Sequence, residues 1–182
     1  ERVLASVTKF VQRQLKLKVN KHKSQVVPIK HSKFLGFTFN GKWLKWHPKT
    51  IEKFKREVRI LTGRSWGVSM EFRLKELNKY LIGWINYFGI ANQFQLCVDL
   101  DGWIRRRIRM CFWKNWRKVK TKVKNLFKLG VYKDLAIFCG MSNKSHWHSS
   151  KTEGINKGLN DKFLKDLGLV SLKAKWVVIH HG

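Results

Sequence analysis

The stretch from Leu100 to Gly130 constrains this chain more than any other. Between Trp103 and Lys128 it contains eleven Lys or Arg residues and no acidic residue. At about 3.6 residues per turn, its apolar residues fall on one side of a helix, the wide stripe typical of a helix that packs on a core. The stripe comprises Ile104, Ile108, Cys111, Phe112, Trp116, Val119, Val123, Leu126 and Phe127. We therefore expect one long helix with a buried side and a strongly basic side.

The basic side of this expected helix is a candidate surface for RNA. Helices that only need to stay soluble usually mix charges of both signs, because opposite charges four residues apart stabilise them. Its first turns carry four arginines, whose guanidinium groups can hold phosphate oxygens at two points, and a helix N-terminus also favours anions. The later lysines would act as point charges. The candidate RNA-binding residues are Arg105, Arg106, Arg107, Arg109, Trp113, Lys114, Arg117, Lys118, Lys120 and Lys124.

The sequence leaves open the role of two tryptophans in this stretch. Trp103 and Trp113 project onto or beside the basic side of the expected helix. An indole in that position can stack on an unpaired base, a contact of about 1 to 3 kcal/mol. It can equally be buried against a neighbouring helix, and the sequence does not choose between the two for either residue.

The composition favours a nucleic-acid partner and argues against a disordered cationic tail. The chain has 182 residues, 39 basic and 11 acidic, and a formal net charge of +28. Such a charge exceeds what solubility requires, so self-repulsion is offset by a polyanionic partner or tolerated at some cost in stability. Apolar residues make up 43% of the chain, including nine Trp and twelve Phe, which is enough for a folded core.

The cysteine spacing and the hydropathy of the chain indicate which cellular compartment suits it. Cys97, Cys111 and Cys139 are odd in number and lack CxxC spacing, so we expect neither a disulfide framework nor a zinc ribbon. A reducing compartment fits best, either the bacterial cytoplasm or an organelle, and not secretion. No apolar run approaches the roughly 20 residues of a membrane span. A cationic membrane-surface protein would need its apolar faces exposed and not used as core, so we expect no membrane partner. Because the chain opens at Glu1 directly in a helical pattern, we expect it to be part of a larger polypeptide.

The remaining pattern predicts further helices and one β-hairpin. Asn40-Gly41 separates FLGFTF from KWLKWH, which predicts a hairpin with a type I′ turn and with Trp43 and Trp46 on one face. Ser69 is the expected N-cap of the helix that follows it. We expect helices over residues 1–15, 48–62, 70–88, 131–139 and 155–167, a short strand near Val26 and Val27, and a polar loop over 141–154.

Two groups of residues in the sequence contain side chains that could bind a metal ion. Asp99 and Asp101 come just before the basic run, where capping of a helix is a far commoner use of Asp than metal binding. Cys139, His146 and His148 lack the CxxC or HxxxH spacing of a zinc site. We therefore expect no metal site and no cofactor in this chain. The loop around His146 and His148 remains either an RNA-contacting tip or a plain surface loop.

Four separated motifs occur in order along the chain: LKVNKHKSQVV, FLGF, RLKELNKYLIGWINYFG and LDGWIRRRIRMCFWKNWR. Together they resemble the C-terminal portion of a group II intron reverse transcriptase, also called an intron maturase, from about residue 1 to 170. The resemblance implies an α+β, mostly α chain, with the end of a polymerase palm at 1–47 and a helical thumb, the maturase-specific domain, at 48–182. It also implies that Phe34, Leu35, Gly36 and Phe37 form a primer grip. Gly36 alone would fit a simple bulge, and the resemblance favours close approach of a primer strand instead.

The chain departs from this family in its acidic residues. The family's metal-binding aspartates lie in earlier motifs that end in a Tyr-x-Asp-Asp turn, and no adjacent Asp pair occurs here. The resemblance therefore implies a part that grips structured intron RNA and the RNA/DNA template–primer duplex, assisting splicing and reverse transcription. Polymerase chemistry and its Mg²⁺ would belong to an upstream site, so we expect no such activity from this chain alone. The alternative is a standalone basic RNA-binding protein unrelated to polymerases.

Overall fold

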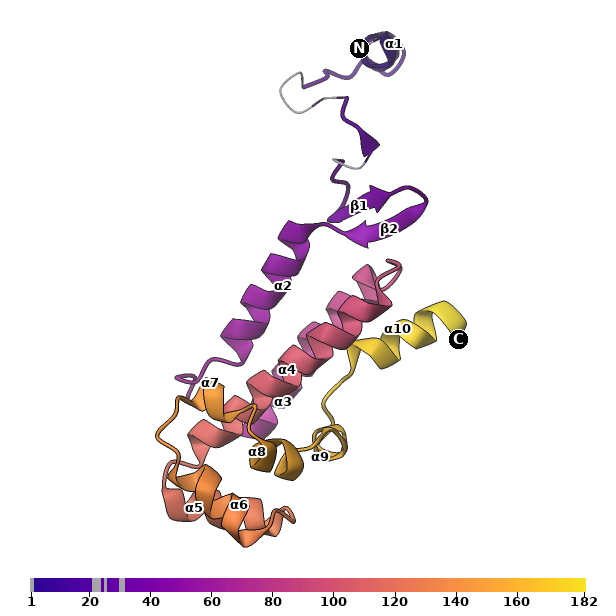
Figure 1. Ribbon diagram of the computed structural model, residues 1–182. Helices are drawn as coiled ribbons and strands as arrows, with labels where there is room; N and C mark the ends of the chain where they lie inside the picture. Colours follow the sequence, from indigo (N-terminus) through magenta and orange to yellow (C-terminus); the bar gives the residue numbers. More distant parts are fainter. Residues whose placement is uncertain (1, 21–23, 25, 30–31) are drawn as a thin grey trace.

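The computed structural model describes residues 2–20, 24, 26–29 and 32–182. Helices dominate these ranges, and their one sheet is a two-stranded antiparallel hairpin, so the expected α+β, mostly α fold is confirmed. Figure 1 shows α1 at one end of the molecule, apart from the hairpin and the other helices. In chain order the elements are α1 (Arg2–Arg13), β1 (Phe37–Asn40), β2 (Trp43–Trp46), α2 (Pro48–Leu61), α3 (Met70–Phe88), α4 (Phe94–Asn115), α5 (Val119–Lys128), α6 (Lys133–Met141), α7 (His146–Ser149), α8 (Glu153–Gly158), α9 (Asp161–Asp166) and α10 (Leu172–His181).

The main core lies between α2, α3, α4 and α10. Figure 1 shows α2, α3 and α4 running along the length of the molecule, and α10 packs against α3 and α4. Pro48 occupies the first turn of α2, and the Ser69 hydroxyl accepts a hydrogen bond from the Phe72 amide at 3.1 Å, so both predicted helix starts are confirmed. The most deeply buried side chains of this core include Phe54, Val58, Leu77, Leu81, Ile85, Leu100, Ile104 and Ile108.

The hairpin covers one end of the main core. Phe37 and Trp46 pair across the two strands, and both are buried. The indole of Trp46 donates to the carbonyl of Phe88 at 2.7 Å, and its ring centre lies 4.7 Å from that of Trp84. Trp43 is 60% exposed, so the expectation that Trp43 and Trp46 share a face is wrong. Residues three apart in a strand point to opposite faces.

The turn of the hairpin is shifted by one residue from the expected position. Asn40 pairs with Trp43, which places Gly41 and Lys42 at the two central positions. Gly41 has a φ of +59°, whereas the φ of Lys42 is not positive. One positive φ at the first central position is the type II′ pattern. The hairpin itself is confirmed, and the expected type I′ turn is wrong because type I′ needs a positive φ at both positions.

The basic stretch forms two helices, so the prediction of one continuous helix from Leu100 to Gly130 is wrong. Three residues separate α4 from α5, and among them Trp116 adopts a non-helical φ of −80° and ψ of 65°. The break allows Trp113 of α4 and Leu126 of α5 to be buried in the same second core. The other buried members of this core are Val131, Ala136, Cys139, Ile155 and Leu159.

The second core depends on close packing of α5 and α6. These two helices lie side by side at the end of the molecule opposite α1 (Figure 1). Gly140 of α6 makes the approach possible, because a Cβ added there would lie 2.6 Å from Cγ2 of Val123 in α5. The break after α4 and this small residue together let a short helical subdomain fold onto the end of the main bundle.

Three of the predicted individual elements differ in the structure. The expected helix over 155–167 is split into α8 and α9, because Asn160 leaves the helix and its side chain caps α9 by accepting from the Phe163 amide at 2.9 Å. The expected loop over 141–154 contains the short helix α7, and Val26 and Val27 are not in a strand. None of the residues of α1 is buried.

Among the residues that the structure describes, no helix combines the length and apolarity needed to cross a bilayer.

Asp101 caps a helix, but a different one from that expected. It lies inside α4, which begins at Phe94, and its side chain is buried. Its carboxylate accepts hydrogen bonds from the Ser171 hydroxyl at 2.6 Å and from the amides of Leu172 and Lys173 at 2.8 and 3.1 Å. These groups open α10, so an acid of α4 satisfies the free amides of a helix some seventy residues away. Asp101 therefore fastens α10 to the main core.

We predict that Asp101→Ala lowers the free energy of unfolding by about 1 to 3 kcal/mol, because it leaves the first amides of α10 without their acceptor. Asp99→Ala is the matched control, since Asp99 is exposed on the same helix and bonds only to Gln95 in the described structure. Its effect should stay within about 0.5 kcal/mol. Urea unfolding followed by circular dichroism measures both. Equal destabilisation by the two variants would contradict the role assigned to Asp101.

Candidate nucleic-acid interface

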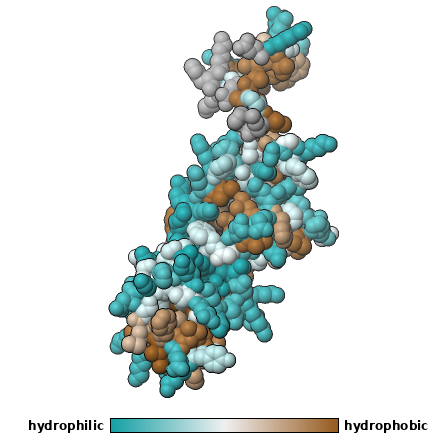
Figure 2. Space-filling view, in the orientation of Figure 1, coloured by the Kyte–Doolittle hydropathy of each residue, from teal (hydrophilic) through white to brown (hydrophobic). Residues whose placement is uncertain are grey.

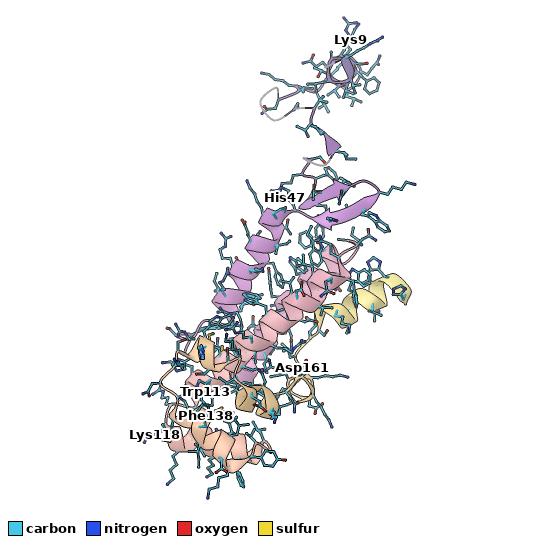
Figure 3. All side chains as sticks on the ribbon, viewed as in Figure 1. Lys9, His47, Trp113, Lys118, Phe138 and Asp161 are labelled. Atoms are coloured by element: carbon cyan, nitrogen blue, oxygen red, sulfur yellow. The ribbon has the colours of Figure 1, made fainter. Side chains whose placement is uncertain are left out.

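The arginines at the start of the basic stretch bind their own protein. The Arg105 and Arg109 guanidinium groups each lie 2.9 Å from Oδ1 of Asp161 in α9, and Arg109 also donates to the Leu159 carbonyl at 2.7 Å. The Arg109 side chain is only 11% exposed. Burial lowers its pKa, and the carboxylate of Asp161 acts in the opposite direction. These two residues hold the C-terminal helices against α4 (Figure 3 labels Asp161).

Arg106 and Arg107 are also engaged within the protein. Arg106 donates to the Trp147 carbonyl at 3.0 Å, and its guanidinium carbon lies 3.8 Å from the centre of the Trp147 ring. Arg107 donates to the hydroxyl of Thr62 at 2.6 Å and to the carbonyls of Arg59 and Thr62 at 3.3 and 3.2 Å. The expected open row of four RNA-binding arginines is therefore not what the structure presents, because each of them joins α4 to another segment.

A second group of cations points away from the protein. It lies at the end of α4, in the joint and along α5, and all its members are exposed. We call this group the basic corner: Lys114, Arg117, Lys118, Lys120, Lys124 and Lys128. Within the ranges given above, none of the six takes part in a salt bridge. No acidic residue lies between Asp101 and Asp134 in the sequence, so the corner has no acidic residue among its own sequence neighbours.

Trp113 lies beneath this corner and not on it. Only 1% of the residue is exposed, and it fills the second core. The ammonium group of Lys122 lies 4.7 Å from the centre of its ring, and burial lowers the pKa of Lys122. The expectation that Trp113 contacts RNA is therefore corrected: the break after α4 turns its indole into the interior, where it supports the residues that carry the charge.

Exposed aromatic residues near the basic corner were missed by the sequence analysis. Phe127 is 61% exposed, Tyr132 78% and Phe138 76%. The sequence pattern placed both Leu126 and Phe127 on the buried stripe, but only Leu126 is buried in the second core. Figure 2 shows brown apolar side chains among teal ones at the end of the molecule where Figure 1 places α5 and α6. Figure 3 labels Lys118 and Phe138 there.

The FLGF segment is divided between surface and core. Phe34 and Leu35 are 65% and 64% exposed, whereas Phe37 is buried. Gly36 has a φ of +87°, and its carbonyl accepts from the His47 amide at 2.9 Å and the Thr50 hydroxyl at 2.7 Å. A Cβ at Gly36 would lie 3.0 Å from the ring of Phe88, so the structure uses its small size for internal packing. Of the four predicted primer-grip residues, Phe34 and Leu35 have side chains exposed to solvent.

Within the described part of the chain, no group of three or more His, Cys, Asp or Glu side chains is placed to hold a metal ion. Cys139 is buried in the second core, where its sulfur lies 3.8 Å from the Thr152 hydroxyl. His146 and His148 belong to α7.

His146 of α7 lies among positive charges. Burial lowers the pKa of its imidazole, and the positive charges of Lys114, Lys122 and Arg64 lower it further. Since an unperturbed histidine titrates near pH ~6.5, this one is neutral at neutral pH. Phosphate groups bound nearby would favour the imidazolium form, because an opposite charge raises the pKa of a histidine.

We predict that RNA affinity rises as the pH falls from about 7 to about 5. The bound protein holds the proton of His146 more tightly than the free protein, so binding takes up a proton and acid favours it. His146→Gln should reduce this pH dependence while preserving the affinity near pH ~8, where wild-type histidine is neutral in the free protein. Fluorescence anisotropy with a labelled RNA hairpin at constant ionic strength measures the effect.

His181→Gln is the control for this prediction, since His181 is an exposed histidine at the end of α10. It should leave the pH dependence of wild type intact. An equal slope of affinity against pH in His146→Gln and wild type would rule out His146 as the titrating group.

Residues 51–130 match the family model described as the group II intron maturase-specific domain. The matched region runs from the first turn of α2 to the residues just after α5, and it contains the basic corner and the arginines of α4. A search of curated proteins found no significant match. The resemblance to the C-terminal portion of a group II intron maturase is thereby confirmed.

Proposed function

We propose, from the premise that residues 51–130 form a group II intron maturase-specific domain, that this chain is the RNA-binding C-terminal part of an intron-encoded reverse transcriptase and maturase. The domain supports a maturase role in intron splicing. In this proposal residues 1–47 are the end of the palm and 48–182 the thumb, and the protein acts on structured intron RNA in a bacterial cytoplasm or an organelle.

The observation that carries this proposal is the uncompensated basic corner. Its five lysines and its arginine are exposed and form no salt bridge within the described residues, so they can neutralise phosphates without first breaking an internal ion pair. Side chains cannot read the deep, narrow groove of an A-form helix, and recognition by a patch of this kind depends on shape and phosphate position. Structured RNA, which gathers phosphates from several strands, is the ligand that suits it.

The exposed aromatic side chains beside the corner support a contact with unpaired RNA as well. Bases in loops stack on aromatic rings, and Phe127, Tyr132 and Phe138 present such rings to solvent. A surface that combines lysines with exposed rings binds a loop or junction more tightly than a uniform duplex. This is the expected preference of a protein that assists the folding of an intron.

The hairpin supplies the second contact in the proposal. Phe34 and Leu35 are exposed on a turn that Gly36 anchors to α2, so the turn can press against the primer strand of a template–primer duplex. Its role would be to position the duplex. The polymerase chemistry and Mg²⁺ would be supplied by the palm of the intact enzyme, upstream of these residues.

A standalone basic RNA-binding protein is the second candidate. One observation favours it: both cores are formed between residues 37 and 172, and α1 adds no buried residue to them. The helical part is thus complete without α1. The reading frame upstream of Glu1 separates the candidates, because the intron enzyme requires an Asp-Asp turn preceded by further polymerase motifs.

We predict that the double variant Lys120→Glu, Lys124→Glu weakens binding to a structured intron RNA by at least about tenfold at low salt. It should also flatten the slope of log affinity against log salt by about 1 to 2, since about two phosphate contacts are lost. Filter binding at several salt concentrations measures both quantities. Arg106 and Arg107 are unsuitable for this test, because their guanidinium groups hold the fold together.

Lys75→Glu, Lys79→Glu is the matched control. These two lysines are also exposed and four residues apart on a helix, α3, so the variant has the same net charge and the same spacing of the changes. At about 0.1 M salt it should lower affinity far less than the α5 variant, because charges beyond about 10 Å are then screened. Similar losses in the two variants would mean that net charge, and not the basic corner, governs binding.

A further inference from the structure

A hollow of about 450 Å³ lies between α2, α4 and α7, and no residue of the basic corner lines it. It is open to solvent and is lined by three arginines, two tryptophans and one methionine, and by no acidic residue. The lining residues are Arg59, Arg64, Trp103, Arg107, Met110 and Trp147. Its volume is within the range of about 300 to 1,000 Å³ that is typical of small-molecule sites. The hollow therefore has room for a single nucleotide and not for a helix.

Two of the side chains that line the hollow are held in place by contacts within the protein. Arg107 is fixed by its hydrogen bonds to Thr62 and Arg59. Trp147 is fixed by Arg106, which stacks on the indole at 3.8 Å and donates to its carbonyl. A site whose side chains are already ordered loses less conformational entropy when a ligand binds.

The hollow combines aromatic surface with unpaired positive charge. Trp103 is half-buried, and the guanidinium carbons of Arg59 and Arg107 lie 5.6 and 5.7 Å from the centre of its ring. Arg64 is exposed on the segment between α2 and α3, and it forms no salt bridge with any residue that the structure describes. Burial lowers the pKa of Arg107, and the charges of Arg59 and Arg64 contribute to the lowering. An anion in the hollow would relieve this repulsion between like charges.

We infer that the hollow is a binding site for one unpaired nucleotide of the RNA, whose base stacks on an indole while its phosphate pairs with Arg64. The inference rests on the proposed function and adds the chemical class of the group that the site selects. An extrahelical nucleotide carries both a flat π surface and a phosphate, which matches the two kinds of side chain in the hollow. In a fully paired duplex the base faces are stacked on one another, so they are not available to the indoles.

The test compares two RNA hairpins that differ only in one bulged nucleotide in the stem, with the full 182-residue chain as the protein. Wild type should bind the bulged hairpin more tightly, by about fivefold to a hundredfold, the range that stacking of one base on an aromatic ring provides. Trp103→Leu should abolish the preference and leave the affinity for the paired hairpin unchanged. Trp103→Phe, which keeps an aromatic ring, should retain most of the preference.

Arg64→Ala should reduce the preference, whereas Arg56→Ala is its matched control as an exposed arginine of α2 outside the hollow. A photoreactive 5-iodouridine placed at the bulge should crosslink to Trp103 or Trp147 in wild type. Urea unfolding of each variant shows that the fold is preserved.

The failure of this inference can be told apart from the failure of the proposed function. If wild type binds the two hairpins equally, or if Trp103→Leu weakens both to the same extent, the nucleotide site is refuted while RNA binding by the basic corner stands. If wild type binds neither hairpin, the proposed function fails, and the inference that depends on it fails as well.

Discussion

Hydrogen bonds from buried guanidinium groups to backbone carbonyls are the interaction on which this structure depends. Arg73 is 2% exposed, and it donates to the carbonyls of Leu61, Gly63 and Trp66, which holds the segment between α2 and α3 in place. The arginines of α4 do the same for α7 and α8. A chain with 39 basic and 11 acidic residues has few carboxylates to pair with its cations. Carbonyls at the ends of helices are free acceptors, and the planar donors of arginine reach several at once.

Because arginines make the internal contacts, the cations that remain exposed to a ligand are mostly lysines. Lysine is a compact, strongly hydrated charge that is costly to bury, and five of the six residues of the exposed basic corner are lysines. The arginines of α4 order the tryptophans and loops around them, and the lysines remain available for phosphate. The two surfaces proposed to meet RNA, the basic corner and the hollow beside Trp103, are both consequences of this division.

Local signals predicted the parts of the fold that depend on neighbours in sequence. The hairpin, the Pro48 start of α2 and the Ser69 cap of α3 were predictable because each is determined by a few adjacent residues. The basic stretch was not, since a helical pattern that continues past Asn115 does not reveal that Trp113 and Leu126 share a core with residues 131–159. The caps show the same limit: an acidic cap was expected near Asp101, but its partners are the amides of α10.

The sequence by itself determined the helical character, the net positive charge and the motifs that carry the resemblance to an intron maturase, because charge and hydrophobic spacing are properties of the chain. Only the tertiary structure decided which cations are free. In the sequence, Arg107 and Lys120 are both candidate RNA-binding cations. In the structure, Thr62 and Arg59 supply hydrogen-bond acceptors to Arg107, whereas no residue that the structure describes forms a salt bridge with Lys120. The availability of a charge depends on which acceptors the fold brings within about 3 Å of it, and that is decided by segments distant in the sequence.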